Sequence, residues 1–357
     1  MLRMPTTLVS RARLAVIAAV FVAGAVSAST PVAINIPVYL KDPVGIVINP
    51  NNGRIYLLDI RPTYQFNSAG YVHVINGDTN QFVKTIAVGQ FSKGITFDGY
   101  HNKVYVTNNL DSNVSIIDAN TDQLVLDGQG NPKTIPIHNG PAAIAFSYYT
   151  SYTYVTYEDN VRNIPAVAVI DGATDTVIGN ITGFDRDLTA MAWPVRGDTA
   201  HLMYALGGGS PARLYSIQPF GGGGSIIRTT DLGNSQSNPF PSLYRAIASE
   251  NTRSLTFIAN SYSNTVSAVD REGTVIHTIP VPARPTAIAG EDHWATGGGH
   301  VFVACEDAGS VVEISGHSVT RTWTGFTLPT AVLFNPRNHQ LYVACAGTQR
   351  QLFAIHI

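Results

Sequence analysis

Short runs of β-branched and aromatic residues, separated by Gly, Asn, Asp and Pro, follow one another from about residue 30 to the end of the chain. KVYVTN (103–108) and VSIID (114–118) are two of them, split by a polar segment. Runs of this length between such turn residues predict β-strands. After residue 28 no stretch keeps the 3.6-residue apolar period of an amphipathic helix, so the pattern predicts an all-β protein.

The strands belong to a repeat. An aromatic residue inside a short apolar strand recurs seven times, at spacings of 40 to 53 residues. The seven copies are Tyr56, Tyr105, Tyr154, Tyr204, Phe257, Phe302 and Tyr342. Each unit contains four strand patterns joined by turns, which is the make-up of a propeller blade. We therefore expect a seven-bladed β-propeller with four-stranded antiparallel blades.

The two ends of the chain predict how the ring closes. The last unit, from Leu328 to Ile357, contains three strand patterns and then the chain stops. The segment AINIPVYLKDPVG (33–45) resembles a fourth strand followed by the start of a blade. We predict that Ile34 to Val38 form the outer strand of blade seven, which removes an open sheet edge. Residues 29–357 then make a single domain.

The strand at 105–108 reads YVTN and is followed by SNVSIID and ANTDQLV. This text resembles the YVTN-repeat family of seven-bladed β-propellers, and the YncE-like exported bacterial proteins in particular. The resemblance implies a binding or cell-envelope protein. Related propellers include lactonases and the propeller subunits of periplasmic oxidoreductases.

The first 28 residues have the features of a secretory signal peptide. Arg3, Arg11 and Arg13 precede the apolar run Leu14–Val26, and small residues lead to a cleavage position after Ala28. The apolar run is too short to span a bilayer comfortably, and no later segment is apolar enough to be a transmembrane helix. We expect a periplasmic or secreted monomer.

Composition narrows the possible partners. Hydrophobic residues make up 45% and charged residues 13% of the chain, which suits a large core and not a disordered chain. The formal net charge is −2, and three arginines lie in the first 28 residues, so the remainder is more acidic. No basic run is present, which argues against nucleic acid as a partner.

No catalytic or metal motif is present, and we predict no cofactor and no metal. The repeated Asn and Asp residues, such as Asn108 and Asp118, fall at strand ends, where they shape turns. Cys305 and Cys345 occupy the same repeat position as Asn108 in neighbouring blades. Equivalent positions on adjacent blades diverge outward, so we expect two buried thiols, with a disulfide as the alternative.

A candidate site lies where the first strands of the blades begin, because these strands line the central channel of a propeller and converge at its mouth. In several blades this position is a Pro followed by a small residue, and blades two, four, five and six depart from that pattern. The departures, which we predict to bind a ligand, are Lys93, Arg186, Asp187, Tyr244, Arg245 and Arg284. Four cations there favour an anionic or polar ligand, since arginine can grip a carboxylate or phosphate with two hydrogen bonds.

Three functions remain open at this point. The first is an exported propeller that binds an envelope protein or a small anionic or polar ligand at the channel mouth. The second is an enzyme of the lactonase or lyase type with its site at the same mouth; its catalytic residues are unknown, and the shortage of histidine there counts against it. The third is the propeller subunit of a periplasmic redox complex. A propeller fold alone does not decide among them.

Overall fold

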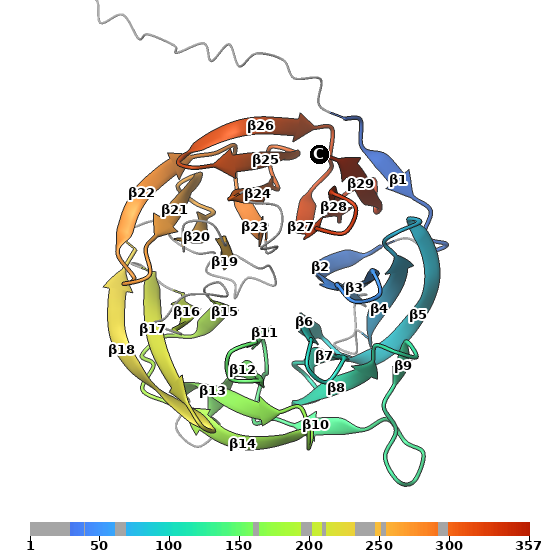
Figure 1. Ribbon diagram of the computed structural model, residues 1–357, viewed down its shortest axis with the longest axis vertical. Helices are drawn as coiled ribbons and strands as arrows, with labels where there is room; N and C mark the ends of the chain where they lie inside the picture. Colours follow the sequence, from blue (N-terminus) through green and yellow to red (C-terminus); the bar gives the residue numbers. More distant parts are fainter. Residues whose placement is uncertain are drawn as a thin grey trace, which may run out of the picture.

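The computed structural model describes residues 29–38, 40–60, 69–159, 164–193, 202–208, 212–232, 247–250, 255–291 and 299–357. Seven antiparallel sheets stand around a common axis, as Figure 1 shows. The described residues form strands and turns and contain no α-helix. The predicted seven-bladed all-β propeller is confirmed.

The inner strands of successive blades contact one another all the way around the ring. They are β2 (Asp42–Asn49), β6 (Ser92–Asp98), β11 (Ile144–Phe146), β15 (Leu188–Ala192), β19 (Ile247–Glu250), β23 (Pro285–Gly290) and β27 (Pro329–Asn335). The second strands are β3 (Arg54–Ile60), β7 (Lys103–Asn108), β12 (Tyr152–Asp159), β16 (Met203–Gly207), β20 (Leu255–Asn260), β24 (His300–Cys305) and β28 (Gln340–Cys345).

Third and outer strands complete the blades. The third strands are β4 (Ala69–Asn76), β8 (Asn113–Asp118), β13 (Ile164–Asp171), β17 (Arg213–Phe220), β21 (Thr265–Val269), β25 (Ser310–Ser315) and β29 (Leu352–His356). The outer strands are β5 (Gln81–Gln90), β9 (Gln123–Leu124) with β10 (Thr134–Pro136), β14 (Thr176–Ile181), β18 (Gly223–Asp231), β22 (Val275–Pro280), β26 (Ser318–Thr324) and β1 (Val32–Ile34).

The ring is closed by the N-terminal strand β1, which pairs antiparallel with β29 in the sheet of blade seven. Ile34 lies opposite Leu352 and Val32 opposite Ala354. Closure by this end of the chain was predicted, but the strand begins and ends earlier than the predicted Ile34–Val38. The earlier register buries Ile34 in a cluster of residues from blades one and seven, and Val32 stays exposed.

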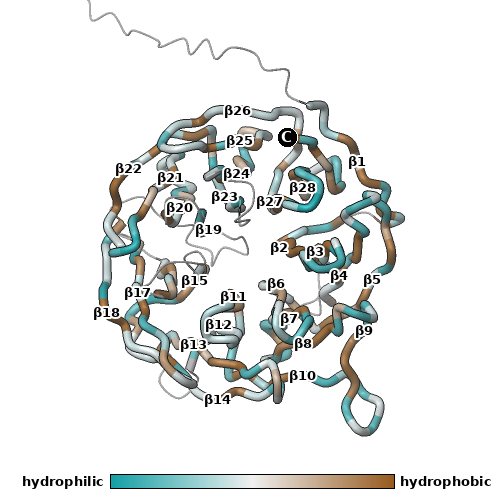
Figure 2. The backbone as a smooth tube through the Cα atoms, viewed as in Figure 1, coloured by the Kyte–Doolittle hydropathy of each residue, from teal (hydrophilic) through white to brown (hydrophobic). Residues whose placement is uncertain are grey.

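Blade two has an interrupted outer edge. After β9 the chain leaves the blade in a loop and returns as β10, and both strands pair with β8. Figure 2 shows that the tip of this loop is hydrophilic. Asp127 closes the loop by accepting hydrogen bonds from the amides of Gln129 and Asn131, both at 2.9 Å.

The seven aromatic residues that mark the repeat are all buried in the second strands. Each packs in a cluster that joins its own blade to the next one. Tyrosine adds a directed bond to this packing. The hydroxyl of Tyr56 donates to Asp122 of blade two at 2.6 Å, and that of Tyr105 donates to Asp175 of blade three at 2.9 Å. Tyr342 of blade seven donates to the backbone carbonyl of Gly77 in blade one at 2.9 Å.

The acceptors occupy one turn of the repeat, between the third and outer strands. This turn reads GDTN, ANTD and GATD in blades one to three. Its last residue has a left-handed backbone, with φ of 58° at Asn80, 55° at Asp122 and 56° at Asp175. Asn and Asp tolerate this conformation better than most residues. The turn therefore holds an acceptor oxygen under the preceding blade, which explains why the sequence repeats Asn and Asp there.

Removing one of these hydroxyls tests their contribution. We expect Tyr105→Phe to lower the free energy of unfolding by about 1–2 kcal/mol, because it deletes a hydrogen bond to the carboxylate of Asp175 in the next blade. The control is Tyr154→Phe, whose hydroxyl bonds the neutral Thr150 of its own blade at 3.1 Å. Urea unfolding measures both. A loss in Tyr154→Phe as large as that in Tyr105→Phe would contradict the prediction.

The closing strand gives a second prediction. Ile34→Ala should destabilise the protein by about 2–4 kcal/mol, because the removed side chain is buried between the first and last blades. Val32→Ala in the same strand removes an exposed side chain and should change stability little. Thermal melts of the two variants decide the matter, and equal losses would show that Ile34 does not anchor the closure.

Candidate functional site

The inner strands begin on one face of the ring, here called face A, and end on the opposite one, face B. At face A the pairing of inner and second strands shifts by one residue in five blades. One residue of the inner strand is then left without a partner and forms a β-bulge. The bulged residues are Val44, Lys93, Thr189, Thr286 and Thr330.

Lysine stands out at this position. The other four bulged residues are buried. The hydroxyl of Thr330 donates to the backbone carbonyl of Pro43 in blade one at 2.6 Å, and that of Thr189 donates to the carbonyl of Leu206 at 3.2 Å. In these blades the bulge is therefore a structural feature that holds a buried side chain. Blade two has the charged amine of Lys93 there, although the bulge forms in the other four blades without a charged side chain.

Lys93 is half-buried, and its Nζ lies 5.3 Å from the centroid of the Phe91 ring. Burial lowers the pKa of this amine below its usual range, and the carboxylate of Glu158 in blade three partly opposes that effect. Among the described residues, no carboxylate lies within ion-pair distance of Nζ. A desolvated cation without a bonded anion is the kind of group that functional sites contain.

Blade four corrects the predicted alignment. Arg186 was aligned with Phe91 and Arg284, but Asp187 takes that place. The amide of Gly208 donates to the carbonyl of Asp187 at 2.9 Å, and the equivalent bond in blade two joins Asn109 to Phe91 at 3.2 Å. The entry of blade four, FDRDLTAMA (184–192), contains no Pro to mark the alignment, which explains the shift. Asp187 is exposed, and half-buried Arg186 lies one residue earlier, with Nη1 3.5 Å from the carbonyl of Gly208.

Arg284 of blade six is engaged by carboxylates. Its Nη1 lies 3.2 Å from Asp307 and its Nε 3.7 Å from Glu306. Burial raises the pKa of Glu306; Arg284 lowers it, and the charges of Asp307 and of Asp42 in blade one raise it further. Arg284 thus neutralises acids of its own blade, and less of its charge is left for a ligand than the sequence predicted.

Asp42 opens blade one beside a buried polar group. Its amide donates to the carboxylate of Asp59 at 2.8 Å, and Asp59 lies 3.6 Å from the imidazole of His73. Burial, together with the charge of Asp59, raises the pKa of Asp42 to about 6. A carboxyl that titrates near this pH can exchange a proton under physiological conditions.

Tyr244 and Arg245, also predicted for this site, lie outside the described residues. Glu158 and Glu306 were not predicted. Both follow the repeat position of Asn108 directly, and the residues in this next position vary from blade to blade. A comparison of the seven second strands one residue further would have found them.

The remaining chemistry of the chain is sparse. Cys305 and Cys345 are free and buried, and burial raises the pKa of both thiols to about 12. In the described part of the chain, no three His, Cys, Asp or Glu side chains are grouped so that they could hold a metal ion. Nor do these residues form a helix with the length and apolar character needed to cross a membrane.

Several solved structures share the ring. Hydrazine synthase of Kuenenia stuttgartiensis aligns with a TM-score of 0.66 and 13% identity over 89% of this chain and 96% of that one. The RRP9 WD40 repeats align with a TM-score of 0.68 and 9% identity over 92% and 98%. Virginiamycin B lyase from Staphylococcus aureus aligns with 0.62 and 12% over 90% and 98%. At such identities the likeness concerns the fold alone. No protein-family model and no curated protein matches the chain.

The shifted carboxyl of Asp42 gives a pH prediction. Its pKa is 3.8 in the unfolded chain and about 6 when folded, so folding takes up a proton between these values, and stability falls as the pH rises through them. Asp42→Asn should therefore melt at a higher temperature than the parent at pH 8, and the gain should shrink towards pH 4.

Calorimetric melts across this range test the prediction, with Asp187→Asn as the control because it changes an exposed carboxylate on the same face. A gain that is independent of pH would contradict it.

Proposed function

We propose that the protein is an exported member of the YVTN-repeat propellers that binds a small anionic or polar ligand, or an envelope protein presenting such a group, at face A. Export rests on residues 1–28, whose sequence has the features of a signal peptide, and implies a periplasmic or secreted protein. Family membership rests on YVTN and its following turns together with the seven-bladed ring.

One observation carries the binding proposal: Lys93 replaces the buried Val or Thr of the repeated bulge. Its half-buried amine lacks a bonded carboxylate among the described residues, while Arg284 is already paired. A carboxylate or phosphate would supply the missing counter-ion and would bind more strongly there than at an exposed lysine, because the site is partly desolvated. Arg186 of blade four is a second candidate donor at the same face.

A thermal-shift screen with inorganic phosphate, sugar phosphates and small mono- and dicarboxylates tests this function. We expect at least one anion to raise the melting temperature of the parent, Lys93→Arg to retain part of the effect, and Lys93→Met to lose it. Lys84→Met, which removes a lysine from outer strand β5, is the matched control. The affinity should fall as the pH rises through the lowered pKa of Lys93, because only the protonated amine attracts an anion.

Two results would exclude the proposal. One is the absence of stabilisation by every anion at millimolar concentration. The other is stabilisation that persists in Lys93→Met, which would move the site away from the bulge.

Acid–base catalysis on the bound ligand is a second candidate function, favoured by the pKa of about 6 at Asp42. It corresponds to the lactonase- or lyase-like alternative. Mass spectrometry of any stabilising compound after incubation with the protein tests it, and Asp42→Asn should abolish a conversion that depends on this carboxyl. Unchanged conversion in Asp42→Asn would remove Asp42 from the reaction.

A further inference from the structure

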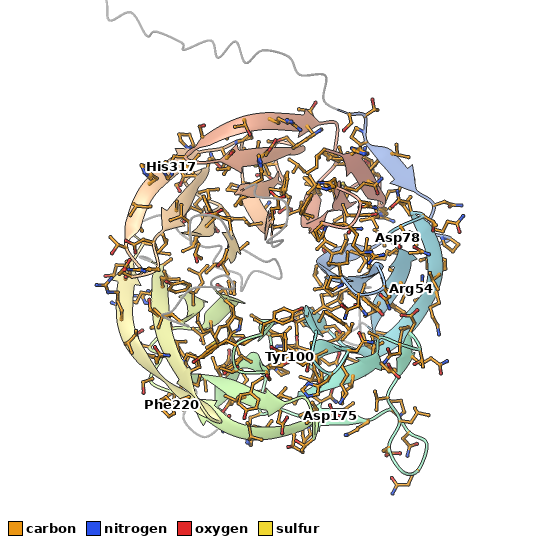
Figure 3. All side chains as sticks on the ribbon, viewed as in Figure 1. Arg54, Asp78, Tyr100, Asp175, Phe220 and His317 are labelled. Carbon is orange, nitrogen blue, oxygen red and sulfur yellow. The ribbon has the colours of Figure 1, made fainter. Side chains whose placement is uncertain are left out.

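Face B carries a group of aromatic side chains in the turn between β6 and β7, at the end of β11 and in the turn between β11 and β12. Tyr100 of blade two meets Phe146 and Tyr148 of blade three with its ring centroid 5.9 Å from each, and the latter two rings are 5.0 Å apart. All three pairs are edge-to-face, which is a favourable geometry for aromatic rings. Figure 3 shows Tyr100 towards the centre of the ring, whereas Asp175 lies further out.

The turns themselves do not require these residues. In blades one, two, three and seven the third residue of this turn donates its amide to a side-chain oxygen two residues earlier. That third residue is Asn51, Tyr100, Tyr149 and Arg337, respectively. Tyr100 is 56% and Tyr149 57% exposed. Blades two and three thus display aromatic rings to solvent where two sister blades display polar groups.

The group is fixed in position. The hydroxyl of Tyr100 donates to the backbone carbonyl of Tyr148 at 2.9 Å. The ring of Tyr148 lies against Gly99, where a Cβ atom would approach its hydroxyl oxygen to 2.5 Å. Any side chain at position 99 would therefore push this ring away. Rings that are already ordered lose little entropy when a ligand settles on them.

A polar group with a fixed orientation stands beside the rings. Nδ1 of His101 donates to the fully buried carboxylate of Asp98 at 2.8 Å. In the neutral imidazole this bond leaves Nε2 as an acceptor, and Nε2 forms no hydrogen bond to a described residue. The nearby Lys103 is paired with Asp175 at 2.7 Å. The surroundings thus offer uncharged hydrogen bonding, and their charges are compensated within the propeller.

We infer that this group on face B is a binding platform for a neutral oligosaccharide. A pyranose ring has a flat face of C–H groups that can stack on the electron-rich face of Tyr100 or Tyr149. Its hydroxyl groups lie around the edge of the ring and can donate to Nε2 of His101. An anionic ligand would find no uncompensated cation among the described residues of the two turns, so this site differs in chemistry from the Lys93 site on face A.

Calorimetric titration of the parent protein with cellohexaose, maltohexaose and chitohexaose tests the inference. We expect at least one of them to bind, and Tyr100→Ala and Tyr149→Ala each to weaken binding about fivefold to tenfold. Tyr100→Phe keeps the ring and should retain more affinity than Tyr100→Ala. Tyr262→Ala, which removes a 53% exposed tyrosine after β20 on face A, and Lys93→Met should leave binding unchanged. Unchanged melting temperatures show that the variants are folded.

The platform is excluded if none of the three hexasaccharides binds at millimolar concentration, or if Tyr262→Ala weakens binding as much as Tyr100→Ala does. Binding of decaproline that competes at the same tyrosines without any sugar binding would assign the surface to a peptide and overturn the inference as well.

Discussion

The pairing of β1 with β29 is the constraint on which the rest of the ring depends. Every blade presents one face to the blade before it and one to the blade after it, so an open ring would leave two apolar faces uncovered. Val32–Ile34 close it by pairing with Leu352–Ala354 of the last blade. The cluster that results combines Ile34, Ile55 and Leu57 with Tyr342 and Leu352. The positions of both proposed binding surfaces follow from this closure, because it fixes each blade against its neighbours.

Much of this fold could be predicted because equivalent side chains have the same structural role in successive blades. An aromatic residue fills the gap between blades in all seven units. In blades one to three an Asn or Asp also allows the left-handed turn between the third and outer strands. The register of β1 could not be predicted in the same way. Apolar residues recur at every second position, Ile34, Ile36 and Val38, so several registers look alike. The burial of Ile34 against the last blade decides among them.

The candidate site was harder to predict than the blades. The entry of blade four contains no Pro to mark the start of its inner strand, so Arg186 was aligned where Asp187 lies. The pairing of Arg284 with Glu306 and Asp307 joins residues more than twenty positions apart, which no local pattern reveals. Lys93 was found because its chemistry breaks the repeat. The tyrosines of face B could not be predicted from the first residues of the inner strands, because they lie in the turns at the opposite ends of these strands.

The hydroxyls of four repeat tyrosines, Tyr56, Tyr105, Tyr204 and Tyr342, each donate to the turn of the next blade. These bonds do not complete the circle, because Tyr154 bonds Thr150 of its own blade. Phe257 and Phe302 occupy this position in blades five and six and have no hydroxyl to donate. The two consecutive interfaces that follow blades five and six therefore depend on the shape of apolar side chains alone at this position. Apolar packing tolerates small sliding movements that a directed bond to a carboxylate resists. We expect the interfaces that follow blades five and six to open locally before the others, so amide exchange with solvent should begin there when the protein is warmed.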